Sequence, residues 1–365
     1  MQKGIFLYTE DFQRYDMGED HPLKPVRIHH TYELLRCIGA LGAADVREPT
    51  PCPLEALKIA HSQDYITVTD RLSSGQHVPS YHRYGFGSGD NPVFPGMWEA
   101  SLLYTGASLD AAQAVMDGAP VAMNLSGGLH HAHYDRAAGF CVFNDAVVAI
   151  QRLRQQFERV AYVDIDVHHG DGVQEAFYDD PSVLTLSIHQ TGQTLFPHSG
   201  YVQDSGIKEG AGYSVNIPLW PYTEDEIWLE AWRKIAVPVL KLFNPQVIVL
   251  QLGADAHYLD PLAQICLTAL GWLEAVKDIH AMDLPVVALG GGGYNQMVVP
   301  RMWTLAYCEL FDMPWNDEIP SCYPYHLVGH TLTDHERPAC APHDRNVVRD
   351  YAAKTIQSLQ ERFLV

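Results

Sequence analysis

Three polar residues alternate with apolar ones at the end of an apolar run near the middle of the chain. Residues 159–172 read RVAYVDIDVHHGDG, so Asp164, Asp166 and His168 are spaced two residues apart. Residues two apart on a β-strand point to the same side of the sheet, which places these side chains in one row. A buried carboxylate is costly without a partner, and a divalent cation would be such a partner. With Asp255, which ends another apolar run, the row predicts three protein ligands, the pattern of a catalytic zinc.

A polar rim held by hydrogen bonds alone is the alternative to a metal, but the nearby histidines favour the metal. His130 and His131 follow a Gly-Gly turn at the end of another apolar run. A lone histidine is usually a surface residue or a hydrogen-bonded core residue, whereas a pair beside spare carboxylates is unusual. Asp164 and Asp171 could each accept a hydrogen bond from one imidazole, which would fix its tautomer and raise its basicity. The pair therefore predicts a general base for an attacking water.

Tyr294 follows four consecutive glycines, residues 290–293. Glycines have no side chains to obstruct the close approach of backbone or ligand. The phenol of Tyr294 could donate a hydrogen bond to an oxyanion. A phosphate-binding loop is the alternative, but this run lacks the GxGxxG spacing of such loops.

Two phenylalanines stand in loops that contain glycine or proline. Phe140 and Phe196 are either ordinary core aromatics, the usual case, or the walls of a narrow apolar channel. Cys141, next to Phe140, is not a predicted nucleophile, because an apolar neighbourhood raises the pKa of a thiol.

Short apolar runs rich in Val, Ile and Leu alternate with longer helix-like stretches. The runs lack the polar alternation of a half-exposed strand, as expected where helices cover both faces of a parallel sheet. The chain is therefore predicted to be α/β, a three-layer α/β/α fold with a central, mostly parallel sheet, formed by residues 1–365 as a single domain. Such sheets bind ligands beyond the carboxyl ends of their strands, where the polar residues above lie. The expected strands are residues 4–8, 121–125, 160–166, 183–188, 246–252 and 286–289, and the expected helices are 95–116, 139–157, 223–243, 267–282 and 345–363.

The composition argues against several classes of protein. The chain of 365 residues, 47% hydrophobic and 19% charged, can bury a large core. Its formal net charge of −20 argues against binding of nucleic acid, which requires clustered Lys and Arg. We find no apolar run of about 18 residues and no signal-peptide pattern, so we expect a cytoplasmic protein that does not bind membranes. Seven cysteines without a CxxC pair offer neither a disulfide framework nor a thiolate zinc site.

These residues together resemble the zinc-dependent histone deacetylase family, in particular its bacterial acetoin-utilisation and histone-deacetylase-like members. The resemblance extends from about residue 21 to Tyr294 and implies the fold of arginases and deacetylases. Its motifs occur in the family's order: GGLHH at 127–131, GFC at 139–141, DIDVHHGD at 164–171, GAD at 253–255 and GGGGY at 290–294.

The resemblance implies one zinc ion per chain and assigns roles to the residues above. Zinc would be bound by Asp166, His168 and Asp255. His131 would act as general base and acid, with His130 mainly electrostatic. Two aspartates would each pair with one of these histidines, Asp164 with His130 and Asp171 with His131. The remaining implied catalytic residue is Tyr294.

The resemblance also implies a substrate tube and two potassium sites. Phe140 and Phe196 would enclose the lysine methylenes of the substrate. The other implied substrate-binding residues are Gly139 and Gly292 in the tube wall, Asp90 at the rim, Leu262 as a hydrophobic wall, and Arg27 at an inner acetate exit channel. Potassium would be bound at one place by Asp164, Asp166, Ser187 and the carbonyls of His168 and Ile188, and at a second by the carbonyls of Phe177, Asp180, Val183 and Tyr213. Pro261 stands where inositol-phosphate-responsive members carry an arginine, so we expect no such regulation.

The expected function is the hydrolysis of Nε-acyl-lysine amides on acetylated lysine-containing proteins or peptides. Acetyl-CoA synthetase is a substrate that the acetoin-utilisation relatives suggest. Three alternatives are an acetylpolyamine amidohydrolase, a ureohydrolase-like enzyme with two manganese ions, and a catalytically silent acyl-lysine binding protein. Residues 312–365 have weak patterning before the last expected helix, and no role is predicted for this segment.

Overall fold

The computed structural model describes residues 3–87, 89–325, 327, 330–336 and 342–364. Its strands form one eight-stranded sheet in the order β2-β1-β3-β8-β7-β4-β5-β6, and every pair of neighbouring strands is parallel. The strands are β1 (Gly4–Leu7), β2 (Ala44–Arg47), β3 (Val121–Asn124), β4 (Val160–Asp164), β5 (Val183–Gln190), β6 (Ser214–Leu219), β7 (Val247–Gln251) and β8 (Val286–Leu289). The predicted α/β class is confirmed, and the sheet is parallel throughout.

The six expected strands are present, and two further strands form the edges of the sheet. The six expected strands are fully buried, which explains their near-continuous apolar sequences. The edge strand β2 has three exposed residues out of four, and its sequence ADVR carries no apolar run. The other edge strand, β6, contains Pro218, which an edge strand tolerates because one side of it needs no hydrogen-bonding partner.

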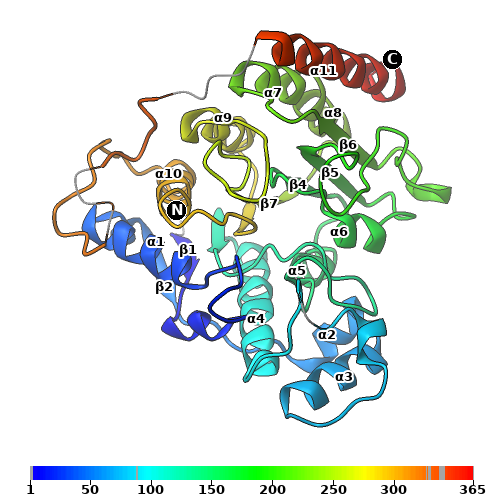
Figure 1. Ribbon diagram of the computed structural model, residues 1–365, viewed down its shortest axis with the longest axis vertical. Coiled ribbons are helices and arrows are strands. Elements are labelled where there is room, and N and C mark those ends of the chain that lie inside the picture. The colour runs from blue at the N-terminus through cyan, green and yellow to red at the C-terminus, as the bar shows by residue number, and fades with distance from the viewer. Residues whose placement is uncertain (1–2, 88, 326, 328–329, 337–341, 365) are drawn as a thin grey trace.

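Helices cover both faces of the sheet (Figure 1). On one face α4 packs on β1, β3 and β8, and α5 packs on β4 and β7, with α2 and α3 outside them. On the other face α1, α10, α9 and α7 lie side by side. The helices are α1 (Val26–Cys37), α2 (Leu54–Ala60), α3 (Gln63–Ser73), α4 (Met97–Met116), α5 (Asp145–Leu153), α6 (Asp171–Ala176), α7 (Asp225–Ala231), α8 (Val237–Phe243), α9 (Ala269–His280), α10 (Val299–Leu310) and α11 (Pro342–Phe363).

One helix boundary differs from its prediction at a place that matters for function. The helix expected over residues 139–157 begins only at Asp145, because Asn144 caps it by accepting a hydrogen bond from the Val147 amide at 3.1 Å. The preceding residues turn instead, and Phe140 has a φ of +70°, a left-handed conformation that is uncommon for a residue with a side chain. Residues 139–144 are therefore free to line the site. Helices α1, α2, α3, α6 and α10 were not predicted from the sequence.

The C-terminal helix α11 covers the edge strand β6. The hydroxyl of Thr355 donates to the carbonyl of Pro218 at 3.1 Å, and Tyr351 donates to the hydroxyl of Thr191 at 2.9 Å. Covering an exposed strand edge protects it from pairing with another chain. This gives part of the segment 312–365 a structural role, although residues 326, 328–329, 337–341 and 365 lie outside the described residues.

The carboxyl ends of the central strands bring the polar residues to one edge of the sheet. Strands β3, β8, β7 and β4 are adjacent and parallel, so the loops that follow them meet. Trp272 of α9 and Trp303 of α10 donate to the carbonyls of Gly253 and Leu252, which holds the loop after β7 in place. Among the described residues, no helix is long and apolar enough to cross a membrane.

Candidate metal centre and active site

Three ligand side chains converge where β4 and β7 end. Ligand atoms of Asp166, His168 and Asp255 all lie within 4.8 Å of one another, and the three residues are buried. Nδ1 of His168 is 3.1 Å from Oδ1 of Asp166 and 3.0 Å from Oδ2 of Asp255. The strand β4 ends at Asp164 rather than at the predicted residue 166. The backbone amides from Asp166 to His168 donate hydrogen bonds to side chains instead of to a neighbouring strand. The amide of Val167, for example, donates to Oδ1 of Asp255 at 2.9 Å.

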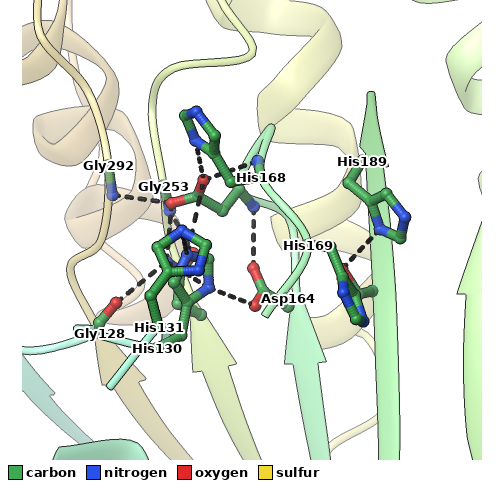
Figure 2. Close-up of polar contacts among 12 residues, drawn as sticks. Gly128, His130, His131, Asp164, His168, His169, His189, Gly253 and Gly292 are labelled. Atoms are coloured by element: carbon green, nitrogen blue, oxygen red, sulfur yellow. Dashed lines mark hydrogen bonds and ion pairs between the residues drawn. The ribbon is translucent and has the colours of Figure 1, made fainter. Parts of the chain in front are cut away.

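Neighbouring groups hold each carboxylate with one oxygen turned toward His168. Oδ2 of Asp166 accepts hydrogen bonds from the side-chain amide of Gln251 and from the Gly292 backbone, both at 2.8 Å (Figure 2). Oδ1 of Asp255 accepts a hydrogen bond from the Val167 amide. The remaining oxygens, Oδ1 of Asp166 and Oδ2 of Asp255, therefore face the imidazole.

The charges in this cluster fit a cation. Burial and the neighbouring Asp166 raise the pKa of Asp255 to about 6. Burial disfavours a charge on His168, but hydrogen bonds to the two aspartates raise its pKa to about 10. Without a metal, a proton on His168 would offset one of the two negative charges of the aspartates, whereas a divalent cation would offset both. Two carboxylate oxygens and one imidazole nitrogen suit a borderline cation with an open coordination position.

Two glycines allow the backbone to lie against the ligands. A Cβ added at Gly292 would lie 1.9 Å from Oδ2 of Asp255, and one added at Gly253 would lie 2.2 Å from Oδ2 of Asp166. Neither position has room for a side chain. Of the four glycines at 290–293, Gly292 thus serves close packing around the carboxylates.

His130 is held as a cation beside the cluster of Asp166, His168 and Asp255. Its Nδ1 lies 2.7 Å from Oδ2 of Asp164, which also accepts from the hydroxyl of Tyr162 at 2.7 Å. Burial opposes a charge on the imidazole, but Asp164 and Asp166 raise the pKa of His130 to about 9. His130 is therefore protonated at neutral pH, and the predicted pairing with Asp164 is present (Figure 2).

The neighbouring His131, in contrast to His130, is held as a neutral imidazole. Its Nδ1 donates to Oδ1 of Asp171 at 2.7 Å, so its Nε2 carries the lone pair, which accepts a hydrogen bond from Nε2–H of His130 at 3.0 Å. Burial and the adjacent positive charge of His130, whose Nε2 is 3.0 Å away, lower the pKa of His131 to about 4. A neutral imidazole with an oriented tautomer can accept a proton, which is what the role predicted for His131 requires.

Tyr294, Phe140 and Phe196 are aromatic residues that lie near His168 or His131. The ring of Tyr294 is perpendicular to that of Phe140, with centroids 5.6 Å apart, and its centroid is 6.4 Å from that of His168. Burial and the nearby Asp255 raise the pKa of Tyr294 well above its usual value, so its phenol remains a donor.

On the opposite side, the ring of Phe196 lies 5.0 Å from that of His131. A Cβ at Gly139 would lie 2.4 Å from Cδ2 of His131 and 2.9 Å from Cε1 of Phe196, so the wall there must be glycine. Both phenylalanines are half-buried, and Phe140 packs against the hydrophobic core.

The other expected substrate-binding residues lie at different depths. The buried Arg27 donates to the carbonyl of Gly293 at 2.8 Å, and its guanidinium stacks 5.0 Å above the ring of Trp303. Leu262 is 37% exposed, in the loop after Asp260. Asp90 is also exposed.

The backbone of Asp90 is connected to the site through a histidine. Its carbonyl is 3.3 Å from Nε2 of His21, and the His21 ring contacts that of Phe140 with centroids 4.5 Å apart. Arg27 thus approaches the glycine run from inside the fold, whereas Leu262 and Asp90 lie at the surface.

The residues expected at two potassium sites fall into two groups. Ser187 of β5 stands opposite Asp164 of β4 in the sheet register, and its hydroxyl is 2.8 Å from Nδ1 of His189 (Figure 2). Ile188 follows on the same strand. The residues of the second group surround the turn from α6 into β5: the Phe177 carbonyl accepts from Asp180, the Asp180 carbonyl from Val183, and the Tyr213 carbonyl from Thr185 of β5.

Two positioning residues were missed from the sequence. Gln251 ends β7 and holds Asp166, and a polar residue that ends an apolar strand is the signal that could have identified it. Asp145, fully buried, accepts hydrogen bonds from the amides of Gly128 and Leu129 at 2.9 and 2.8 Å, which fixes the loop that carries the two histidines. An acidic residue at the start of an apolar helix is its only local signal.

Comparisons with known proteins agree with this geometry. A family model described as the histone deacetylase domain matches residues 21–310. The acetoin utilization protein AcuC of Bacillus subtilis (strain 168) is 43% identical over 330 residues, which cover 88% of this chain and 85% of that protein. Histone deacetylase B of Dictyostelium discoideum is 37% identical over 319 residues, which cover 86% of this chain and 75% of that protein.

Solved structures are similar over nearly the whole chain. An HDAC homologue from Aquifex aeolicus has a TM-score of 0.88 and 32% sequence identity, and the match covers 97% of this chain and 100% of the other. An HDAC homologue complexed with SAHA has a TM-score of 0.88 and 31% identity, and the match covers 98% of this chain and 100% of the other.

Proposed function

The chain belongs to the histone deacetylase family of hydrolases, and we propose that it is a zinc-dependent enzyme that removes acetyl or related acyl groups from Nε-acyl-lysine side chains of proteins or peptides. One observation carries this proposal: a neutral, oriented His131 lies beside a buried cluster of two aspartates and one histidine, with the phenol of Tyr294 nearby. A base, a cation site and an oxyanion donor are the groups that hydrolysis of an amide requires.

Asp166, His168 and Asp255 would hold the zinc ion, in agreement with their donor types and their convergence. When bound there, zinc would polarise the acyl carbonyl and lower the pKa of water toward neutrality. The nearby cation His130 would add positive charge to the site as the negative charge of the tetrahedral intermediate develops.

His131 would move the proton. Its Nε2 takes a proton from the attacking water while Nδ1 remains hydrogen-bonded to Asp171, which stabilises the imidazolium that forms. When the carbon–nitrogen bond breaks, the same proton passes to the lysine nitrogen, and the products are the carboxylic acid and the free amine, between which one proton then moves to give the carboxylate and the ammonium ion. His131 thus returns to its neutral state after each cycle.

Tyr294 would donate its phenolic proton in a hydrogen bond to the oxyanion, since its high pKa keeps the phenol protonated. Phe140 and Phe196 would pack against the methylenes of the substrate lysine. Arg27 would direct the released carboxylate from the inner side of the glycine run. Potassium ions would bind at the two groups of residues described above and stabilise the loops after β4 and before β5.

The net charge of −20 suits an acylated protein or peptide that is otherwise cationic, and acetyl-CoA synthetase is a specific candidate. The experiment is a screen of acyl-lysine peptides with different acyl chain lengths against acetylated polyamines, using protein whose metal content is measured in parallel. We expect turnover of acetyl-lysine peptides with one zinc ion per chain.

Each alternative gives a different result in this screen. Preference for acetylated polyamines would identify a polyamine amidohydrolase. Two manganese ions per chain would favour a ureohydrolase-like enzyme. Binding of acyl-lysine peptide or of SAHA by zinc-replete protein without any turnover would indicate a silent acyl-lysine binding protein, and would overturn the proposal.

A further inference from the structure

A second histidine continues the hydrogen-bonded row behind the proposed base. Oδ1 of Asp171 accepts from His131, and Oδ2 of the same carboxylate lies 3.3 Å from Nε2 of His133. Nδ1 of His133 contacts Oε2 of Glu175, one helical turn further along α6. The side chain of His133 is 6% exposed and that of Glu175 is 56% exposed, so the row runs from the site to the surface.

The partners of His133 require it to be a cation. Both ring nitrogens face carboxylates, which only accept hydrogen bonds when ionised, so both nitrogens must carry protons. Burial opposes this charge, but Asp171 and Glu175 raise the pKa of His133 to about 9. Asp171 therefore lies between a neutral imidazole, His131, and a charged one, His133.

The backbone around His133 is fixed, so its ring cannot swing away without disrupting other contacts. The His133 amide donates to the carbonyl of Arg136 at 2.9 Å, and its own carbonyl is 2.9 Å from Nδ1 of the buried His61. Asn144 donates to the carbonyl of Ala132 at 2.9 Å.

On its outer side the ring borders a surface cavity of about 600 Å³, which Asp171 and Glu175 also line. The Asp171 side chain is 15% exposed and reaches this cavity beside the His133 ring.

We propose that His133 is a positioning residue: anchored by Glu175, its imidazolium holds the Asp171 carboxylate so that Oδ1 remains hydrogen-bonded to Nδ1 of His131 and the lone pair of His131 stays on Nε2. This inference rests on the proposed role of His131 as the base. His133 does not touch the substrate and acts only through Asp171. A fixed carboxylate keeps the imidazole of the base in one tautomer. Residues that contact a catalytic group but not the substrate influence turnover in this way.

The kinetic test compares His133→Gln with His133→Lys in the zinc-loaded enzyme. Glutamine can still donate to Asp171 but has no charge, whereas lysine retains both the charge and the donor. We expect kcat for an acetyl-lysine peptide to fall about 10-fold or more in His133→Gln with KM unchanged, the range for residues behind a catalytic group. His133→Lys should recover most of the loss.

A matched control uses another imidazole–carboxylate pair far from the site. Nδ1 of His280 lies 3.3 Å from Oε1 of Glu309, the same separation as in the pair of His133 with Asp171. His280→Gln should leave kcat and KM unchanged. An unchanged kcat in folded, zinc-replete His133→Gln would overturn the proposal.

A double-mutant cycle separates an effect through Asp171 from an independent structural effect. If His133 acts through that carboxylate, His133→Gln should produce no further loss of kcat in an Asp171→Asn background. If His133→Gln instead lowers kcat by the same factor in the original protein and in Asp171→Asn, His133 does not act through Asp171.

A spectroscopic measurement keeps this inference distinct from the proposed function. In histidine-labelled protein, the Nδ1–H proton of His131 reports its hydrogen bond to Asp171 whether or not the protein turns over peptide. We expect this resonance to shift in His133→Gln and to return toward its original position in His133→Lys. Identical spectra for the original protein and His133→Gln would refute the positioning role, whereas absence of turnover with a shifted resonance would refute only the proposed function.

Discussion

Replacing Gly292 by alanine should disrupt the metal site without unfolding the protein. The new Cβ would lie 1.9 Å from Oδ2 of Asp255 and 2.9 Å from Oδ2 of Asp166, and side-chain Cβ atoms essentially never approach another atom within 3.0 Å. Relief requires a movement of at least 3.0 − 1.9 = 1.1 Å, by Asp255 or by the backbone of residue 292. Zinc sites tolerate ligand distances that vary by only about 0.2 Å.

A displacement of this size should weaken zinc binding about 10- to 100-fold, equivalent to about 1.4–2.8 kcal/mol. Competition with a chelator of known affinity measures the zinc Kd directly, and circular dichroism checks the fold. The matched control is Gly42→Ala, because a Cβ at Gly42 meets nothing within 4 Å and its φ is ordinary. Gly42→Ala should keep the original Kd. A Gly292→Ala protein with unchanged zinc affinity would show that Asp255 is not a ligand in the position described.

Three further predictions concern the oxyanion donor, the charge on His133 and the C-terminal segment. Tyr294→Phe should reduce kcat about 10²-fold or more while zinc content and thermal stability remain unchanged, since it removes one donor to the oxyanion; full activity would exclude that role. The pKa of His133 rises from 6.5 in the unfolded chain to about 9, so its charge stabilises the fold fully below pH 6.5 and progressively less as the pH rises to 9. Urea unfolding across this range should show the stability difference between the original protein and His133→Gln shrinking with pH, and a constant difference would contradict the charge assignment. Asp334→Ala should lower the free energy of unfolding by about 3–5 kcal/mol, because it leaves the buried guanidinium of Arg301, 2.6 Å away, without its partner. The exposed Asp20→Ala serves as the control, within about 0.5 kcal/mol of the original protein in the same chemical-denaturation measurement.

The buried cluster of Asp166, His168 and Asp255 and the central strands could be predicted from the sequence because their signals are local. Asp166 and His168 are marked by polar residues just after an apolar run, although the strand ends at Asp164 and both residues lie in the loop that follows. The six central strands are buried on both faces and are therefore apolar throughout. The edge strands β2 and β6 lack that signal, since only part of β2 is buried and β6 contains proline.

Contacts between distant segments had no local signal, and only the tertiary structure decided them. The adjacency of β4 and β7 brings Asp255 to His168 from 87 residues away and lets Gln251 hold Asp166. The connection from Asp171 through His133 to Glu175 depends on how the loop after β3 packs against α6. Residue types and their spacing therefore determined which chemistry this chain can perform. The order of its strands and the packing of its loops determined which carboxylate each histidine contacts, and thereby which imidazole carries the higher pKa.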